Sequence, residues 1–150
     1  MDGFSLNNKE LVQTLGIIPP LLMIDYAEAI IPGESARGVK NLSDKEWFFK
    51  CHPSGLAMPG TLQTEAMLQT LVLAVYTMEG HKGKYSFITQ INTKLISTVS
   101  INDQFVIHAN LLSYRRGLAK GVVEGKVKDK TVCKGNYIFF SPHEAILPHK

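Results

Sequence analysis

The chain has 150 residues, a length that suits one domain, because a single hydrophobic core commonly serves roughly 100–200 residues. Its 45% hydrophobic and 19% charged residues are typical of a globular protein. A net charge of +3 is too small to indicate a nucleic-acid-binding protein. Neither Cys51 nor Cys133 has a partner at a zinc-binding spacing, and we interpret both as buried or semi-buried free thiols.

The N-terminal part of the chain predicts a short helix and then two extended segments. Asn7 or Asn8 caps a helix that ends near Gly16. A double proline then prevents further helix and begins an extended segment that continues over residues 21–31. After a Pro-Gly turn, residues 36–42 predict a returning strand.

The middle of the chain predicts a buried helix. Residues 43–46 are typical of a cap before one helical turn over 47–49, and an irregular stretch follows. Pro59 suits the first position of a helix, and residues 60–79 contain strong helix formers. This segment is apolar nearly all the way round, so the sequence predicts a helix covered on all sides.

The second half of the chain predicts antiparallel strands. Four segments are rich in β-branched and aromatic residues: 85–96, 104–113, 118–127 and 131–140. The separators at 116–117 and 128–130 indicate turns or bulges. Because no repeat or linker interrupts the sequence, we expect one α+β domain over residues 1–150, a curled antiparallel sheet wrapped around one long central helix.

The ends of the chain and its apolar stretches indicate no membrane association. The first residues lack the charged-then-apolar pattern of a signal peptide. The longest apolar stretch, 67–78, contains polar residues and is too short to span a bilayer. We therefore expect a cytoplasmic protein.

Two polar residues on the predicted helix are candidates for chemistry. Glu65 and Gln69 are four apart, so they share a face and can form a hydrogen bond. A carboxylate on an apolar helix is costly unless it is paired, and burial would raise its pKa toward a value that suits proton donation. The alternative is an exposed first-turn glutamate favoured by the helix dipole, and the spacing alone leaves both open.

The loop before the helix contains His52. A lone loop histidine is more often packed or exposed than catalytic, yet beside a helix start and a carboxylate it makes an acid–base pair a reasonable hypothesis. The backbone N–H groups of Gly60 and Thr61 point out of the helix start and are able to polarise a carbonyl there. The signatures of nucleotide binding and of serine hydrolysis are absent from the sequence.

Three motifs make the middle of the chain distinctive: Trp47-Phe48-Phe49-Lys50-Cys51-His52, Met58-Pro59-Gly60 and Glu65-Ala66-Met67-Leu68-Gln69. With these motifs the chain resembles, over roughly residues 18–140, the β-hydroxyacyl-acyl-carrier-protein dehydratases, in particular the β-hydroxydecanoyl-type enzymes and the dehydratase domains of polyunsaturated fatty acid synthases. The resemblance implies a hot-dog fold that assembles as a homodimer or a dimer-based higher oligomer. It also implies an active site at the dimer interface, with the histidine from one subunit and the acid from the other.

The resemblance also implies roles for single residues. His52 removes the α-proton and Glu65 protonates the departing 3-hydroxyl group. The Gly60 amide donates to the thioester carbonyl, and Gln69 supports the acid. The other substrate-binding residues are those that precede Gly60 in its motif, Met58 and Pro59.

The chain departs from the family between His52 and Met58, where its loop is one residue short. Counting back from Met58 without a gap would put Cys51 at the catalytic position, but the match upstream favours His52. The resemblance also implies a cis peptide bond after the histidine, here between His52 and Pro53, where a proline makes a cis bond less costly. The acid is a glutamate, as in the branch that only dehydrates, so double-bond isomerisation is not expected.

The resemblance implies dehydration of 3-hydroxyacyl thioesters to trans-2-enoyl thioesters in fatty acid or polyketide-type biosynthesis. The carrier is acyl carrier protein or coenzyme A, and an acidic carrier protein would dock near Arg115, Arg116 and Lys120. No metal or organic cofactor is expected, because the thioester itself acidifies the α-proton. The alternatives are a hot-dog acyl thioesterase and a non-catalytic acyl-binding protein.

Overall fold

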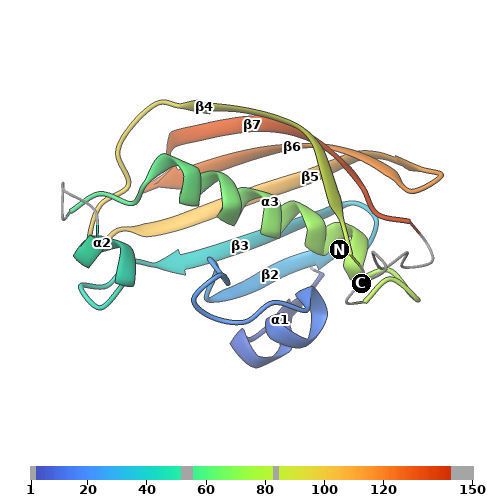
Figure 1. Ribbon diagram of the computed structural model, residues 1–150, viewed down its shortest axis with the longest axis horizontal. Helices are drawn as coiled ribbons and strands as arrows, with labels where there is room; N and C mark the ends of the chain where they lie inside the picture. Colours follow the sequence, from blue (N-terminus) through green and yellow to red (C-terminus); the bar gives the residue numbers. More distant parts are fainter. Residues whose placement is uncertain (1–2, 52–55, 83–84, 143–150) are drawn as a thin grey trace.

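The computed structural model describes residues 3–51, 56–82 and 85–142. Seven antiparallel strands form one sheet in the order β1-β2-β3-β5-β6-β7-β4, and the sheet curls around helix α3 (Figure 1). The predicted α+β hot-dog arrangement is therefore confirmed. In chain order the elements are β1 (Phe4–Leu6), α1 (Asn8–Leu15), β2 (Tyr26–Ile31), β3 (Ser35–Asn41), α2 (Trp47–Cys51), α3 (Gly60–Tyr76), β4 (Phe87–Leu95), β5 (Gln104–Arg115), β6 (Leu118–Val127) and β7 (Lys130–Phe140).

Helix α1 begins and ends at the predicted residues. The Asn7 side chain accepts from the Glu10 amide at 2.9 Å, and the Glu10 carboxylate accepts from the Asn7 amide at 3.0 Å. This reciprocal capping box satisfies two amides that the first turn leaves without partners. Gly16 ends the helix with φ 73°, a left-handed conformation that favours glycine.

The later strands follow the predicted pattern, and their separators are tight turns rather than bulges. Arg115 pairs with Leu118, and Val127 pairs with Lys130, so each hairpin loop has two residues. The loop residues have positive φ, as in the turns that match the twist of a hairpin. They are Arg116, Gly117, Lys128 and Asp129.

Three predicted boundaries were wrong. Strand β1 was not expected, because its three residues show no alternation and are fixed only by pairing with β2. The extended segment 21–31 enters the sheet only at Tyr26, since the backbone before it bonds to the Gln69 side chain. Helix α3 ends at Tyr76, where the Thr77 amide and hydroxyl both donate to the Leu73 carbonyl.

Helix α3 lies against the inner face of the sheet, and glycines let it approach closely. A methyl group at Gly38 would collide with Thr70, and one at Gly121 would collide with Leu71. From Ala66 to Tyr76 every residue of α3 is buried, as predicted. None of the helices in the described parts of the chain is long and apolar enough to cross a membrane.

Candidate active site at the start of helix α3

The predicted substrate-binding motif forms the N-terminus of α3. Met58 is buried, and its amide donates to the Val99 carbonyl at 2.7 Å. Pro59 occupies the N-cap position, one residue earlier than predicted. The Leu62 and Gln63 amides both donate to the Pro59 carbonyl, at 3.0 Å each. The amides of the first helical residues, Gly60 and Thr61, precede the first intrahelical bond, so this helix start has donors available for a ligand.

Glu65 and Gln69 form the predicted contact. Gln69 Nε2 donates to Glu65 Oε1 at 3.0 Å, and it also donates to the Leu21 carbonyl at 2.9 Å. Gln69 Oε1 accepts from the Met23 amide at 2.8 Å. Glu65 is partly buried and lies in the second turn, so the alternative of an exposed first-turn glutamate is wrong. The buried Gln69 amide thus fixes the carboxylate to the segment that leads into β2.

Replacing Gln69 with leucine is expected to lower the free energy of unfolding by about 1–3 kcal/mol, because the Met23 amide and the Leu21 carbonyl lose their partner in a buried setting. Urea denaturation measures this change. Gln63→Leu is the matched control, since Gln63 is also a buried α3 glutamine but makes one hydrogen bond, to the Met58 carbonyl, and its Oε1 has none. Equal losses in the two variants would contradict the supporting role of Gln69.

A hollow of about 250 Å³ lies beside the start of α3, lined by Trp47, Phe48, Cys51, Pro59, Thr61 and Leu62. Cys51 ends α2 and is exposed, so its interpretation as a buried or semi-buried thiol is wrong. Cys133 is buried as expected, and burial raises the pKa of its thiol to about 11. Because Cys51 lines the hollow, it lies beside the start of α3.

His52 and Pro53 lie outside the described residues. The predicted role of His52 and the predicted cis bond between the two residues therefore stay predictions. The cis peptide bond in the described part of the chain is Pro19–Pro20.

Strand β4 is an open, apolar edge beside this site. β4 pairs with β7, and no strand among those described pairs with its other edge. Ile88, Ile91 and Leu95 pair with inward-facing residues of β7, yet they are 42%, 55% and 53% exposed. A methyl group at Gly60 would collide with Leu95, so this strip reaches the helix start. A long apolar edge with no cover is a surface suited to pairing with another chain.

A chain of hydroxyl groups that the sequence did not reveal ties β4 to α3. Thr64 Oγ1 lies 3.3 Å from Thr93 Oγ1, which lies 2.7 Å from the Tyr137 hydroxyl. Burial raises the pKa of Tyr137, so this phenol stays protonated at neutral pH. Only the inward alternation of Thr93 in its strand would have hinted at this contact.

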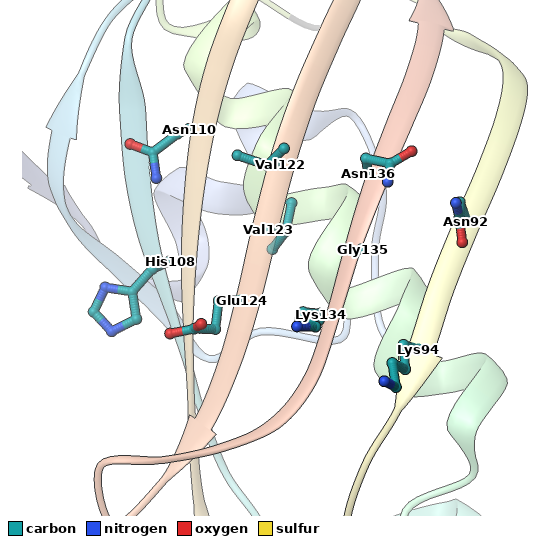
Figure 2. A pocket seen from close by; sticks show the side chains of 10 residues that line it. All are labelled: Asn92, Lys94, His108, Asn110, Val122, Val123, Glu124, Lys134, Gly135 and Asn136. Atoms are coloured by element: carbon teal, nitrogen blue, oxygen red, sulfur yellow. The ribbon is translucent and has the colours of Figure 1, made fainter.

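A second hollow, of about 570 Å³, lies on the other face of the sheet. Figure 2 shows its side chains, among them Lys94, His108, Glu124 and Lys134, with α3 behind the strands. Burial lowers the pKa of His108, and the nearby charges of Arg37 and Lys126 lower it further. None of the predicted site residues that the structure describes lines this hollow, and the sheet separates it from the start of α3.

Sequence comparisons agree with the motifs at the helix start. A family model described as a FabA-like domain matches residues 18–136. The 3-hydroxyacyl-[acyl-carrier-protein] dehydratase FabZ of Syntrophomonas wolfei is 30% identical over 141 residues, which cover 93% of this chain and 98% of the relative. The FabZ of Caldicellulosiruptor bescii is 35% identical over 130 residues, covering 83% and 93%.

Solved structures share the fold at low sequence identity. The dehydratase heterocomplex ApeI:P from Xenorhabdus doucetiae has a TM-score of 0.74 at 13% identity, covering 88% of this chain and 90% of that one. Cj0977, a sigma28-regulated virulence protein from Campylobacter jejuni, has a TM-score of 0.70 at 16% identity, covering 89% and 86%. At these identities the likeness supports the hot-dog fold alone. The family model, which matches residues 18–136, and the relatives, which cover 83–93% of the chain at 30–35% identity, show that the chain belongs to the FabA-like domain family.

Proposed function

We propose that the chain is a hydro-lyase that dehydrates 3-hydroxyacyl thioesters, carried by acyl carrier protein, to trans-2-enoyl thioesters. The observation that supports this most is the 30% identity to a 3-hydroxyacyl-[acyl-carrier-protein] dehydratase over 93% of this chain and 98% of that enzyme. The proposal places the activity in the cytoplasm, in fatty acid or polyketide-type biosynthesis, and assigns it to one domain over residues 1–150.

In the proposed reaction His52 takes the proton from C2 of the acyl chain as general base. The C3–O bond breaks, the electron pair of the C2–H bond becomes the C2–C3 double bond, and the hydroxyl takes a proton from Glu65 and leaves as water. The contact of Gln69 with Glu65 Oε1 supports this role, because it fixes the carboxyl group through one of its two oxygens.

The start of α3 supplies the proposed electrostatic help. Removal of the C2 proton moves negative charge onto the thioester oxygen, and in the proposal the Gly60 amide donates to that oxygen. A fixed donor of this kind lowers the barrier by about 2.7–4 kcal/mol in other enzymes. Met58 and Pro59 hold the helix start, through the Met58–Val99 backbone bond and the bonds that the Pro59 carbonyl accepts.

The proposed active unit is a homodimer joined along β4. The exposed Ile88, Ile91 and Leu95 support this, because pairing two β4 edges would cover them and continue the sheet into the partner. In such a dimer His52 of one subunit acts with Glu65 of the other. An acidic carrier protein would approach through Arg115, Arg116 and Lys120, which are basic residues on or between β5 and β6.

Incubation of the purified protein with 3-hydroxyacyl and trans-2-enoyl thioesters, followed by mass spectrometry, tests the proposal. Loss of one water from the first and gain of one by the second are expected. Paired substrates on acyl carrier protein and on coenzyme A distinguish the two carriers by kcat/KM. Release of free thiol would instead indicate a thioesterase, and binding without any change would indicate a non-catalytic acyl-binding protein.

A further inference from the structure

We infer that Lys40 is a positioning residue, which joins the segment that holds Glu65 to the segment that leads into His52 of the same subunit. In the proposed dimer these two residues act in different active sites, so each Lys40 supports both sites. This inference rests on the proposed function. Lys40 lies on β3, where it is paired with Phe105, so its side chain points to the inner face of the sheet. It belongs to none of the three sequence motifs that carry the resemblance.

Lys40 is the buried centre of a partly buried ion cluster, in which the side chains of Glu46 and Asp25 are 17% and 35% exposed. The Lys40 side chain is 7% exposed, and Nζ lies 2.8 Å from Glu46 Oε1 and 3.2 Å from Asp25 Oδ1. The other oxygen of Asp25 accepts from the Asn41 amide at 2.7 Å. A buried ammonium group is costly unless it is paired in good geometry, so the cluster holds these two carboxylates in place.

One carboxylate of the cluster leads to Glu65. Asp25 follows Met23 by two residues, and the Met23 amide donates to Gln69, whose side chain donates to Glu65. The Asp25 amide also donates to the Val39 carbonyl at 2.8 Å. Gln69 therefore holds the segment before β2 at Leu21 and Met23, and Lys40 holds the same segment at Asp25.

The other carboxylate leads to α2. Glu46 immediately precedes α2, and its carbonyl accepts from the Phe49 amide at 3.2 Å. Phe48 is 1% exposed, so the helix is seated in the core as well. Cys51 ends α2, and His52 is the next residue in the sequence. One ammonium group thus bridges the segment that supports the acid of one proposed site and the helix that precedes the base of the other.

Lys40→Met tests the inference, because methionine keeps the apolar stem and removes the charge. We expect kcat to fall about 10- to 100-fold with KM changed less than about threefold, since a misplacement of about 1 Å can cost 100-fold. Hydrogen exchange gives a readout that needs no activity. The Met23 and Asn41 amides are expected to exchange faster, while the amides of β6 keep wild-type rates.

Arg37→Met is the matched control, because Arg37 lies on the same strand and makes an exposed ion pair with Glu28 at 3.4 Å. It is expected to keep wild-type kcat. If Lys40→Met folds poorly, Glu46→Gln provides a milder change with the same expected pattern and a smaller fall in kcat.

Two results would overturn the inference while the proposed function stands. One is wild-type kcat in folded Lys40→Met or Glu46→Gln; the other is exchange that rises equally at Met23 and throughout β6, as for a purely structural residue. A wild-type protein that fails to dehydrate any thioester would overturn the proposed function instead. The exchange rates would then still decide whether Lys40 holds the segment that supports Glu65.

Discussion

Glu65→Gln is expected to lower kcat for dehydration about 10²- to 10⁴-fold, the range that a positioned general acid contributes. Glutamine has nearly the same shape, and its carbonyl oxygen still accepts from Gln69 Nε2. It has no acidic proton to give to the departing hydroxyl group. Because binding contacts persist, KM is expected to change little, and the loss is expected in kcat under saturating 3-hydroxyacyl thioester.

The control for this variant is Glu124→Gln, which removes a carboxylate from the other face of the sheet. It is expected to keep wild-type kcat. Glu65→Gln and His52→Ala act on one step, so the double variant is expected to lose little more than the worse single variant. If kcat of Glu65→Gln stays within about threefold of the wild-type value, Glu65 is not the general acid.

Local patterns were enough to predict most of the fold. Asn7 and Glu10 have the spacing of a capping box, and α1 has that cap. Strand β6 has the predicted bounds, because its alternation is clear and tight turns flank it. The contact of Glu65 with Gln69 also followed from sequence, since side chains four apart on a helix are neighbours.

Contacts between distant segments were not predictable in this way. Met23 and Gln69 are 46 residues apart, so no helix or strand period connects them. Lys40 is an unremarkable strand residue in the sequence, and only the fold brings Asp25 and Glu46 to it. Strand β1 was missed for the same reason. Three residues are too few to show a periodic pattern, and only pairing with β2 makes them a strand.

The open edge of β4 leaves inward-facing apolar side chains exposed, which the alternation of the sequence alone did not predict. An inward-facing isoleucine would normally be buried, yet Ile91 is 55% exposed because the sheet ends beside it. In the proposed dimer the partner's edge strand would cover this residue.

Ile91→Lys is expected to convert the proposed dimer to a monomer and to lower kcat/KM about 100-fold or more at micromolar protein, because a charged side chain in the middle of an edge strand opposes pairing. Sedimentation velocity measures the assembly, and the dehydration assay measures the activity of the same sample. Gln90→Lys is the control, since Gln90 pairs with Ile138 and points to the other, solvated face. It is expected to leave both dimer and activity intact.

Activity and assembly together decide where the site is. One possible result is that Ile91→Lys is monomeric and inactive, and that the monomer remains inactive after it is mixed with wild type. The site then needs both subunits. If the monomer retains wild-type kcat, His52 and Glu65 of one chain act together, and the open β4 edge serves assembly alone. A variant that stays dimeric would place the interface elsewhere and remove the argument from the exposed Ile88, Ile91 and Leu95.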